Sequence, residues 1–260
     1  MPFKEGDFVL VNYVVSVVEG GKEVVQDTNI EDVAKRAGLH SPDRRYEPYL
    51  VVIGRSQVLP AIDEELRNMD VGQRKEFTAP PEKAYGPHRD DLVIRVPIRQ
   101  LNRYGITPVV GRRVEVGGRV GVIRSVTERF AYIDFNHPLA GKELKIELEV
   151  VRKLETPEEK VRFLALRYLP LKEGDIGVSL GAQGVVELSL PADALRLSDL
   201  ESRLQLLAGD LRQLLGVSGL RIVIEVKFEG QAAPAAGGQS EAQQPQEQAQ
   251  AQQGQVSQQA

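Results

Sequence analysis

The sequence predicts an α+β protein built mainly from antiparallel sheets, with few and short helices. Three observations carry this prediction. Residues 8–18, FVLVNYVVSVV, are rich in branched apolar residues, which are typical of strands. Residues 144–150, LKIELEV, alternate apolar and charged side chains, as in a sheet with one face in water. After Thr156, helical and strand patterns alternate in a final segment. Because 260 residues exceed the usual length of one domain, we expect two or three domains.

The amino-terminal segment predicts the start of the main sheet. The strand at 8–18 leads into residues 19–23, EGGKE, which are typical of a hairpin turn into a second strand. Residues 29–48 form a long connection, in which we expect a short helix from Glu31 to Ala37. The strand at 144–150 is expected to close this sheet.

One short helix and one further strand follow in the first half of the chain. Pro60 opens a helical pattern that has Ile62, Leu66 and Met69 on one face. Proline is favourable there because the first turn of a helix does not use its N–H. Residues 70–80, DVGQRKEFTAP, then predict a turn that leads into a strand.

A β-rich segment with its own turns interrupts the sheet between Pro87 and Asn136. Residues 111–123, GRRVEVGGRVGVI, and 129–135, RFAYIDF, predict short strands, with a hairpin at Gly117 and Gly118. We therefore predict a small inserted domain at 89–136. The first domain is then discontinuous and consists of residues 1–88 and 137–154.

Residues 155–230 predict a separate C-terminal α/β domain in the order α-β-β-α-β. Thr156 and Glu159 form a capping-box pattern at the first helix. Ser198 and Glu201 form a similar pattern before a second helix, and a strand is expected to end at Phe228. The second helix carries leucines that pack in the core or, alternatively, form a short coiled-coil seam: Leu200, Leu204, Leu207, Leu211 and Leu214. Core packing is favoured because only about two heptads are present.

Composition narrows the classes of function. The chain has 33 basic and 37 acidic residues and a net charge of −4, which argues against nucleic acid as a partner. It has no cysteine and three histidines far apart in the sequence, so we predict no metal and no cofactor. Residues 1–20 contain acidic side chains among the apolar ones, which fits neither a signal peptide nor a membrane span. We expect a cytoplasmic protein with no membrane partner.

The last thirty residues differ from the rest of the chain. Residues 231–260 contain twelve glutamines, eight alanines and no basic residue. Such a segment cannot bury enough apolar surface to offset the entropy of ordering, so we predict a disordered tail. The tail is either a solubilising extension or a glutamine-mediated interaction segment.

Several motifs occur in an order that resembles one enzyme family. They are VNYVV at 11–15, VVQDT at 24–28, VIGRSQVLPAIDEEL at 52–66, AYG at 84–86 and NHPLAGKELKIELEV at 136–150. Together they resemble the FKBP-type peptidyl-prolyl cis-trans isomerases over residues 1–154. The segment between AYG and NHPLAGK is similar to the insert-in-flap domain of the SlyD-like and long archaeal branch of that family.

The resemblance implies an antiparallel sheet wrapped around the Pro60 helix, with an apolar pocket for a proline ring between them. It implies catalytic roles for Tyr13, Asp27, Leu59 and Tyr85, in which the Leu59 N–H and the Tyr85 hydroxyl donate to substrate carbonyls. Asp27 is expected to hold the Tyr13 hydroxyl, to polarise the bound amide, or merely to stabilise a turn. The remaining predicted wall residues are Tyr49, Val58, Ile62, Leu139 and Ile146.

The resemblance also implies a reaction that needs no nucleophile, because isomerisation of an Xaa-Pro bond breaks no covalent bond. Aliphatic or polar residues stand at Gln26, Ile62 and Ile146, where the best-known family members have aromatics. These differences predict a shallower pocket and argue against the binding of macrolide drugs. The implied partners are unfolded or nascent polypeptides that contain proline, captured by a chaperone insert. Two alternatives remain: a holdase chaperone with a decayed isomerase pocket, and a purely structural protein. A homodimer through the C-terminal domain is also possible.

Overall fold

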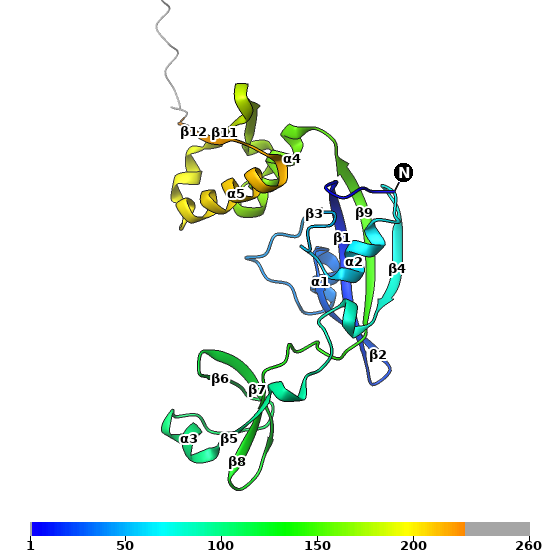
Figure 1. Cartoon of the computed structure of the whole chain (residues 1–260), viewed down its shortest axis with the longest axis vertical. Helices are drawn as coiled ribbons and strands as arrows, with labels where there is room; N and C mark the ends of the chain where they lie inside the picture. Colours follow the sequence, from blue (N-terminus) through cyan, green and yellow to red (C-terminus); the bar gives the residue numbers. More distant parts are fainter. Residues whose placement is uncertain (1, 227–260) are drawn as a thin grey trace, which may run out of the picture. The chain divides into compact units, whose positions relative to one another are not determined.

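The computed structural model describes residues 2–226, and both the predicted tail and Phe228 lie outside this range. Within the described residues, most strand pairs are antiparallel and most helices are short, which confirms the α+β fold class (Figure 1). None of the helices in residues 2–226 combines the length and the apolar character needed to cross a membrane.

The first sheet has the strand order β2-β1-β9-β4, and β3 pairs with β1 at its edge. Its strands are β1 (Phe8–Glu19), β2 (Lys22–Thr28), β3 (Tyr49–Val52), β4 (Arg74–Ala79) and β9 (Leu144–Leu154). The expected hairpin joins β1 and β2 through two glycines in the left-handed region. The strand that we expected to close the sheet, β9, instead lies inside it, because both of its edges are paired, with β1 and with β4.

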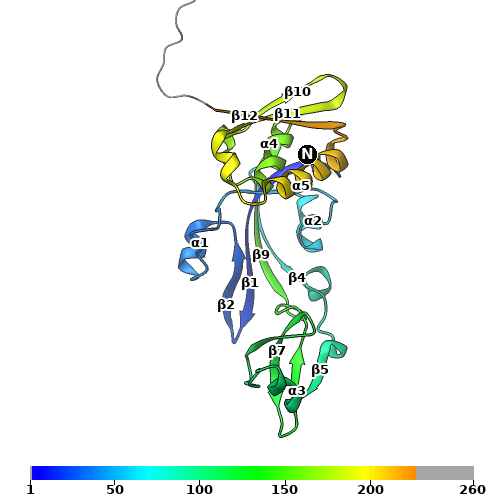
Figure 2. The ribbon, with the colours of Figure 1, turned by 90° about the vertical axis from the view of Figure 1, so that its left-hand side faces the viewer.

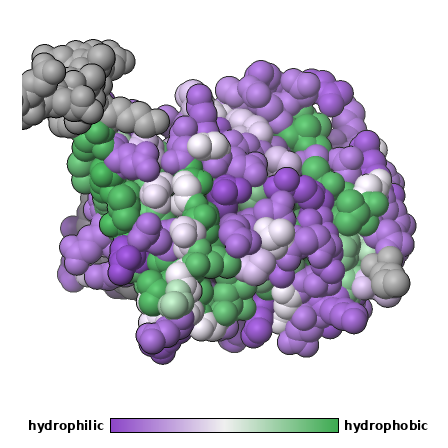
Figure 3. Space-filling model, turned by 90° about the horizontal axis from the view of Figure 1, so that it is seen from above, coloured by the Kyte–Doolittle hydropathy of each residue, from purple (hydrophilic) through white to green (hydrophobic). Residues whose placement is uncertain are grey.

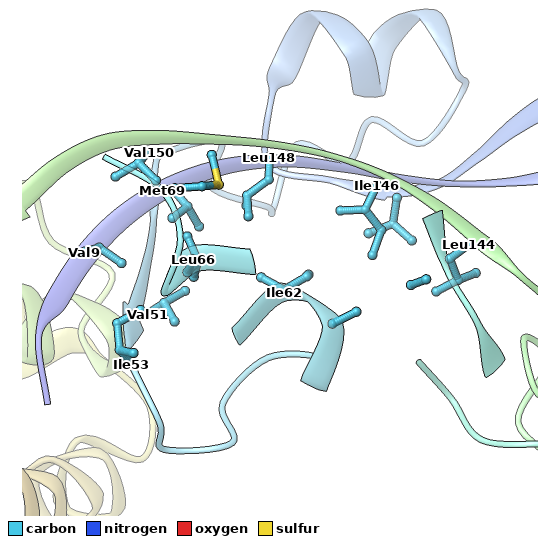
Figure 4. Packing of buried hydrophobic residues seen from close by; sticks show 14 of the residues in the cluster. Val9, Val51, Ile53, Ile62, Leu66, Met69, Leu144, Ile146, Leu148 and Val150 are labelled. Carbon is cyan, nitrogen blue, oxygen red and sulfur yellow. The ribbon is translucent and has the colours of Figure 1, made fainter. Parts of the chain in front are cut away.

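Two helices belong to this sheet, α1 (Glu31–Arg36) and α2 (Pro60–Leu66), and α1 is the helix expected in the long connection. Leu66 of α2 is fully buried against one face of the sheet. Figure 4 shows Leu148 and Ile146 of β9 directed toward α2, where Ile62 and Leu66 meet them. Each such side chain contributes about 1.5–3 kcal/mol through burial, so this cluster fixes α2 on the sheet.

The second sheet, in the order β5-β8-β7-β6, forms the inserted segment. Its elements are β5 (Val93–Pro97), α3 (Ile98–Arg103), β6 (Arg113–Val116), β7 (Arg119–Val126) and β8 (Phe130–Asp134). The expected hairpin joins β6 to β7, with Gly117 and Gly118 both at positive φ. Of these elements, β5 and α3 were not predicted from the sequence. A separate hydrophobic cluster around Leu101, Ile123 and Ile133 holds this sheet together.

The C-terminal segment has the predicted order of elements. They are α4 (Pro157–Tyr168), β10 (Gly177–Leu180), β11 (Val185–Pro191), α5 (Leu200–Leu215) and β12 (Gly219–Glu225). The Thr156 capping box is present. The Ser198 box is wrong: α5 begins after Asp199, which adopts a left-handed conformation and makes no side-chain cap. Short 3-10 helices complete the described structure: Pro81–Lys83, Asp90–Leu92, Glu173–Asp175, Ala182–Gly184 and Ala192–Arg196.

The core of the C-terminal segment is shared with the first sheet. Side chains alternate along β1, so Val9 and Val11 face α2, whereas Phe8 and Leu10 pack with α4 and α5. The α5 leucines join this second cluster, which confirms core packing over a coiled-coil seam. Figure 2 shows α4 and α5 on one side of the strands β10, β11 and β12.

Candidate functional site

A cavity of about 380 Å³ lies between α2 and the first sheet. We call it the sheet–helix cavity. It brings together these predicted site residues: Tyr13, Asp27, Tyr49, Val58, Leu59, Ile62 and Tyr85. The other lining residues are Val11, Val15, Ser56, Gln57, Pro60 and Leu148. Residues from distant parts of the sequence thus meet at one mostly apolar hollow.

Two of the expected wall residues do not line this cavity. Ile146 is fully buried and Leu139 nearly so, and both belong to the cluster packed around it. For Ile146 the register of β9 matters: Leu148 pairs with Tyr13 of the cavity wall, whereas Ile146 lies between Val15 and Phe77 on the neighbouring strands. The residue of β9 that faces the cavity is therefore Leu148, two positions further along the same face of the strand.

The loop before α2 holds one wall of the cavity. Gly54 has φ +78°, and a Cβ there would come within 2.7 Å of the Glu5 side chain, so this position requires glycine. The Gly54 N–H donates to Asp63 Oδ1 of α2 at 2.8 Å, which ties the loop to the helix. The loop then delivers Val58 and Leu59 to the cavity.

Leu59 is the N-cap residue of α2, and Pro60 occupies the first helical position. The Leu59 carbonyl accepts hydrogen bonds from the N–H groups of Ile62 and Asp63. Among residues 2–226, the Leu59 N–H forms no hydrogen bond. A backbone donor beside an apolar wall is therefore available to a ligand carbonyl.

A polar group of three side chains lies at one end of the cavity, and we call Tyr13, Asp27 and Arg44 the polar anchor. The Tyr13 hydroxyl donates to Asp27 Oδ2 at 2.9 Å, and Arg44 donates to Asp27 Oδ1 at 2.7 Å. Arg44 also reaches the Tyr13 hydroxyl at 3.3 Å. Burial, and then the Asp27 carboxylate, raise the pKa of Tyr13, so the phenol stays protonated.

Irregularities in β2 direct Asp27 toward Tyr13. The β1–β2 register shifts between Val15 and Ser16, so that Gln26 is an extra residue opposite this step. Beyond Asp27, the buried Asn29 accepts from the Tyr13 N–H and donates to the carbonyls of Val11 and Glu47. Asn29 therefore fastens the long connection that carries Arg44. Sequence reasoning missed both Asn29 and Arg44, because no local pattern links them to the cavity.

Tyr85 stands at the rim of the cavity. Its ring stacks on His137 at a centroid distance of 4.0 Å and an angle of 5°. His137 Nδ1 accepts the N–H of Leu139 at 3.1 Å, so this histidine orders the loop that carries it. Burial, and then the charge of Asp27, raise the pKa of Tyr85. Its hydroxyl has no hydrogen-bond partner among the described residues, so it is free to donate to a ligand.

Chemically, the site combines an apolar hollow with a few fixed donors. Three tyrosines and a backbone N–H line the space, together with the Asp27 carboxylate, whose oxygens accept from Tyr13 and Arg44. Such a site suits a reaction driven by selective binding rather than by bond cleavage.

Comparison with known proteins identifies the family. A family model described as FKBP-type peptidyl-prolyl cis-trans isomerase matches residues 2–96, and one described as FKBP26, IF domain, matches residues 95–139. The short-type peptidyl-prolyl cis-trans isomerase of Methanocaldococcus jannaschii is 37% identical over 147 residues, which cover 56% of this chain and 91% of that protein. The chain belongs to the FKBP-type peptidyl-prolyl cis-trans isomerases.

More distant relatives carry related descriptions. The FKBP-type isomerase SlyD of Helicobacter pylori is 26% identical over 155 residues, covering 58% of this chain and 75% of the relative. The FKBP-type 16 kDa isomerase of Escherichia coli is 27% identical over 110 residues, covering 40% and 73%. The isomerase described here therefore catalyses cis/trans interconversion of Xaa-Pro bonds in polypeptides.

Proposed function

We propose that the sheet–helix cavity is the active site of the isomerase and that it acts on Xaa-Pro bonds of unfolded or partly folded proteins. One observation carries the proposal: seven side chains from separate motifs surround one apolar hollow that is open to a peptide. Val58, Ile62 and Tyr49 form its walls together with Leu148, and Leu139 and Ile146 support the wall from behind.

The walls supply the catalytic advantage. Rotation about the Xaa-Pro bond has a barrier of about 20 kcal/mol, because the planar amide is stabilised by resonance. The twisted transition state loses this resonance, so its carbonyl is less polar than in the planar amide. A water-poor apolar cavity therefore binds the twisted form more strongly than the planar one.

Directed donors orient the peptide in this cavity. The Leu59 N–H and the Tyr85 hydroxyl, both without partners among the described residues, donate to substrate carbonyls. Asp27 acts through Tyr13, because its two oxygens are already engaged by Tyr13 and Arg44. The polar anchor thus fixes the Tyr13 ring as part of the wall.

A direct test is NMR exchange spectroscopy on a short Xaa-Pro peptide with catalytic amounts of protein, since the uncatalysed exchange takes tens of seconds. We expect enhanced exchange, and we expect Leu59→Asp to abolish it by placing a charge in the wall. Lys22→Glu, at the start of β2 and outside the cavity lining, is the control. Equal exchange with Leu59→Asp and Lys22→Glu would place catalysis elsewhere.

We also propose a division of labour among domains: isomerisation by residues 1–88 and 137–154, client capture by the insert at 89–136, and a distinct domain at 155–230. The insert exposes large apolar side chains that its own core leaves out: Tyr104, Val109, Val110 and Val120. Exposed apolar side chains suit binding of unfolded chains. The holdase alternative predicts the same capture without catalysis of exchange.

We also propose that the protein self-associates through its C-terminal segment. Figure 3 shows apolar patches among hydrophilic residues on the face seen from above. The C-terminal segment exposes Leu180, Leu195 and Leu206. Sedimentation of the full chain tests the idea: a dimer that Leu206→Glu or Leu195→Glu dissociates would support it, and a monomer at all concentrations would reject it.

A further inference from the structure

A second cavity, of about 590 Å³, lies between the first sheet and α4. We call it the α4 cleft. Its apolar lining includes Tyr49 and Leu50 of β3, Val151 of β9, and Phe163 and Leu166 of α4. Tyr49 and Val151 are exposed to solvent at 41% and 40%. Apolar side chains are thus presented to solvent in a concave surface large enough for several peptide side chains.

The α4 cleft adjoins the sheet–helix cavity. Tyr49 lines both hollows, and its ring meets Tyr13 of the polar anchor edge-on at 6.3 Å. Arg167, which lines the cleft, donates to Gln57 Oε1 in the lining of the cavity at 3.0 Å. The Tyr49 side chain and the Arg167–Gln57 hydrogen bond therefore lie between the α4 cleft and the sheet–helix cavity.

The outer edge of β3 is partly occupied where the two hollows meet. Arg167 donates to the Leu50 carbonyl at 3.1 Å, and Gln57 accepts the Val52 N–H at 3.1 Å. These two backbone groups are therefore unavailable to a further strand, which weakens pairing at this edge. A chain lying here is bound mainly through its side chains.

The charges of the cleft favour acidic chains. Its lining carries the basic residues Arg45, Arg152, Arg167 and Lys172 and the acidic residues Glu47 and Glu173. Glu47 and Glu173 pair with Arg45 and Arg152, and Arg167 pairs with Asp210 outside the cleft. The Lys172 backbone N–H donates to Asp175 Oδ2 at 3.2 Å, but among the described residues its ammonium group forms no salt bridge. Its ammonium group is left for an anionic ligand.

We propose that the α4 cleft binds the part of the client polypeptide that flanks the proline, with a preference for apolar side chains accompanied by Asp or Glu. The inference rests on the proposed active site in the sheet–helix cavity, from which the bound chain continues past Tyr49. The C-terminal segment thereby contributes to substrate selection, because α4 forms one side of the cleft. Short peptides that occupy only the cavity do not reach it.

The test compares three peptides with the same central Xaa-Pro bond. One is short, and two are long, with either aspartates or lysines in the flanks. Exchange NMR gives kcat and KM, and fluorescence anisotropy of the labelled long peptides gives Kd without requiring turnover. We expect Lys172→Glu to raise KM and Kd of the aspartate peptide about threefold, as is typical of one exposed charge pair. We expect the lysine peptide to bind Lys172→Glu more tightly than it binds the wild-type protein. The short peptide should have the same KM and kcat with both proteins.

Lys22→Glu makes the same charge change at the start of β2, outside both cavities. Val151→Asp places an acid in the apolar floor and is expected to weaken both long peptides. If Lys172→Glu affects the long peptides no more than Lys22→Glu does, the inference is overturned, even when the short peptide is turned over. If Lys172→Glu changes sedimentation of the peptide-free chain, the cleft is instead an interface between copies. Failure of the proposed active site has a different signature: wild-type protein then turns over no peptide, whatever the anisotropy.

Discussion

The Tyr13 hydroxyl is held between one acceptor and one donor. It donates to Asp27 and accepts from Arg44, while the N–H of the same residue donates to Asn29. Its ring is thereby fixed from two sides, and Tyr49 packs against it edge-on. A large side chain with few remaining conformations gives the cavity a wall that loses little entropy when a peptide binds.

Substitutions at Asp27 and Tyr85 separate positioning from direct donation. Asp27→Ala removes a hydrogen bond to Tyr13 and one to Arg44, each worth about 1 kcal/mol because solvent screens this partly exposed group, so we expect turnover of a short Xaa-Pro peptide to fall about tenfold or more. Tyr85→Phe removes one neutral donor, worth about 1 kcal/mol, and a loss of about fivefold is expected. Asp27→Asn should retain part of the activity, because its amide oxygen still accepts from Tyr13. The measurement is exchange NMR, and equal rates for all variants would show that the polar anchor does not serve catalysis.

His137 makes the rim sensitive to acid. Burial lowers its pKa below the ordinary value of 6.5, and Nδ1 must be unprotonated to accept the Leu139 N–H. The unfolded chain therefore binds the proton more readily than the folded one, and stability falls as the pH drops below about 6.5. We expect the His137 ring resonances to titrate with a midpoint under 6.5 and the Tyr85 ring resonances to move with them. His137→Gln should abolish the coupled Tyr85 titration, and a midpoint above 6.5 would contradict the argument.

At the scale of elements, two helix starts with similar sequence patterns behave differently. Thr156 accepts the Glu159 N–H, and Glu159 accepts the N–H groups of Thr156 and Glu155, which lowers the pKa of its carboxyl. Near α5, the Ser198 carbonyl accepts from Arg203, and its side chain makes no cap. The left-handed conformation of Asp199 moves the helix start by one residue. The capping-box pattern therefore forms a real cap at α4 but not at α5.

This contrast gives a matched pair of substitutions. Thr156→Ala removes a real cap and should lower the free energy of unfolding by about 1 kcal/mol. Ser198→Ala removes only an unused hydroxyl and should change it by less than about 0.5 kcal/mol. Urea denaturation of both variants and wild type provides the measurement. Equal losses would mean that Ser198 caps α5 in solution.

The segments that lead into and out of the insert are fastened to each other. The Arg89 N–H donates to Asn136 Oδ1 and the Asn136 side chain donates to the Arg89 carbonyl, both at 2.9 Å. Buried Asp134 joins them by accepting from Arg124 and Asn136, and its oxygen lies 3.1 Å from His88 Nε2. Burial alone would raise the pKa of Asp134, but these hydrogen bonds outweigh burial and lower it. The insert thus begins and ends at one closed junction.

At the scale of the whole molecule, the inserted and C-terminal segments differ in independence. The insert has its own hydrophobic cluster, whereas the C-terminal cluster includes Phe8, Leu10, Leu50 and Val52 of the first sheet. The C-terminal segment therefore depends on the first sheet for part of its core. Truncation at residue 156 would expose these four side chains, so point substitutions are the better probes of that segment.

In contrast to truncation at residue 156, deletion of the insert exposes no part of the core of the first sheet, because the insert has its own hydrophobic cluster. Deleting residues 90–135 leaves Arg89 and Asn136 to close the junction. We expect turnover of short Xaa-Pro peptides to stay within about twofold, while catalysis of proline-limited refolding of an unfolded protein falls roughly tenfold or more, because the linked second site no longer raises the effective concentration of client. Paired assays on peptide and protein substrates measure this. Parallel loss on both substrates would contradict the division of labour.

The sequence by itself determined the local features and the family. The branched run at 8–18, the glycine turns and the Thr156 cap follow from interactions between near neighbours, and the ordered motifs around Tyr13, Leu59 and Tyr85 identified the FKBP-type isomerases. Tertiary structure decided which face each residue serves. Alternation along β1 says that neighbouring residues point apart, but only packing assigns Val9 to α2 and Phe8 to α4. Strand register put Leu148 rather than Ile146 at the cavity, and a long connection brought Arg44 to Asp27. These choices depend on contacts between residues far apart in the chain, which no local pattern encodes.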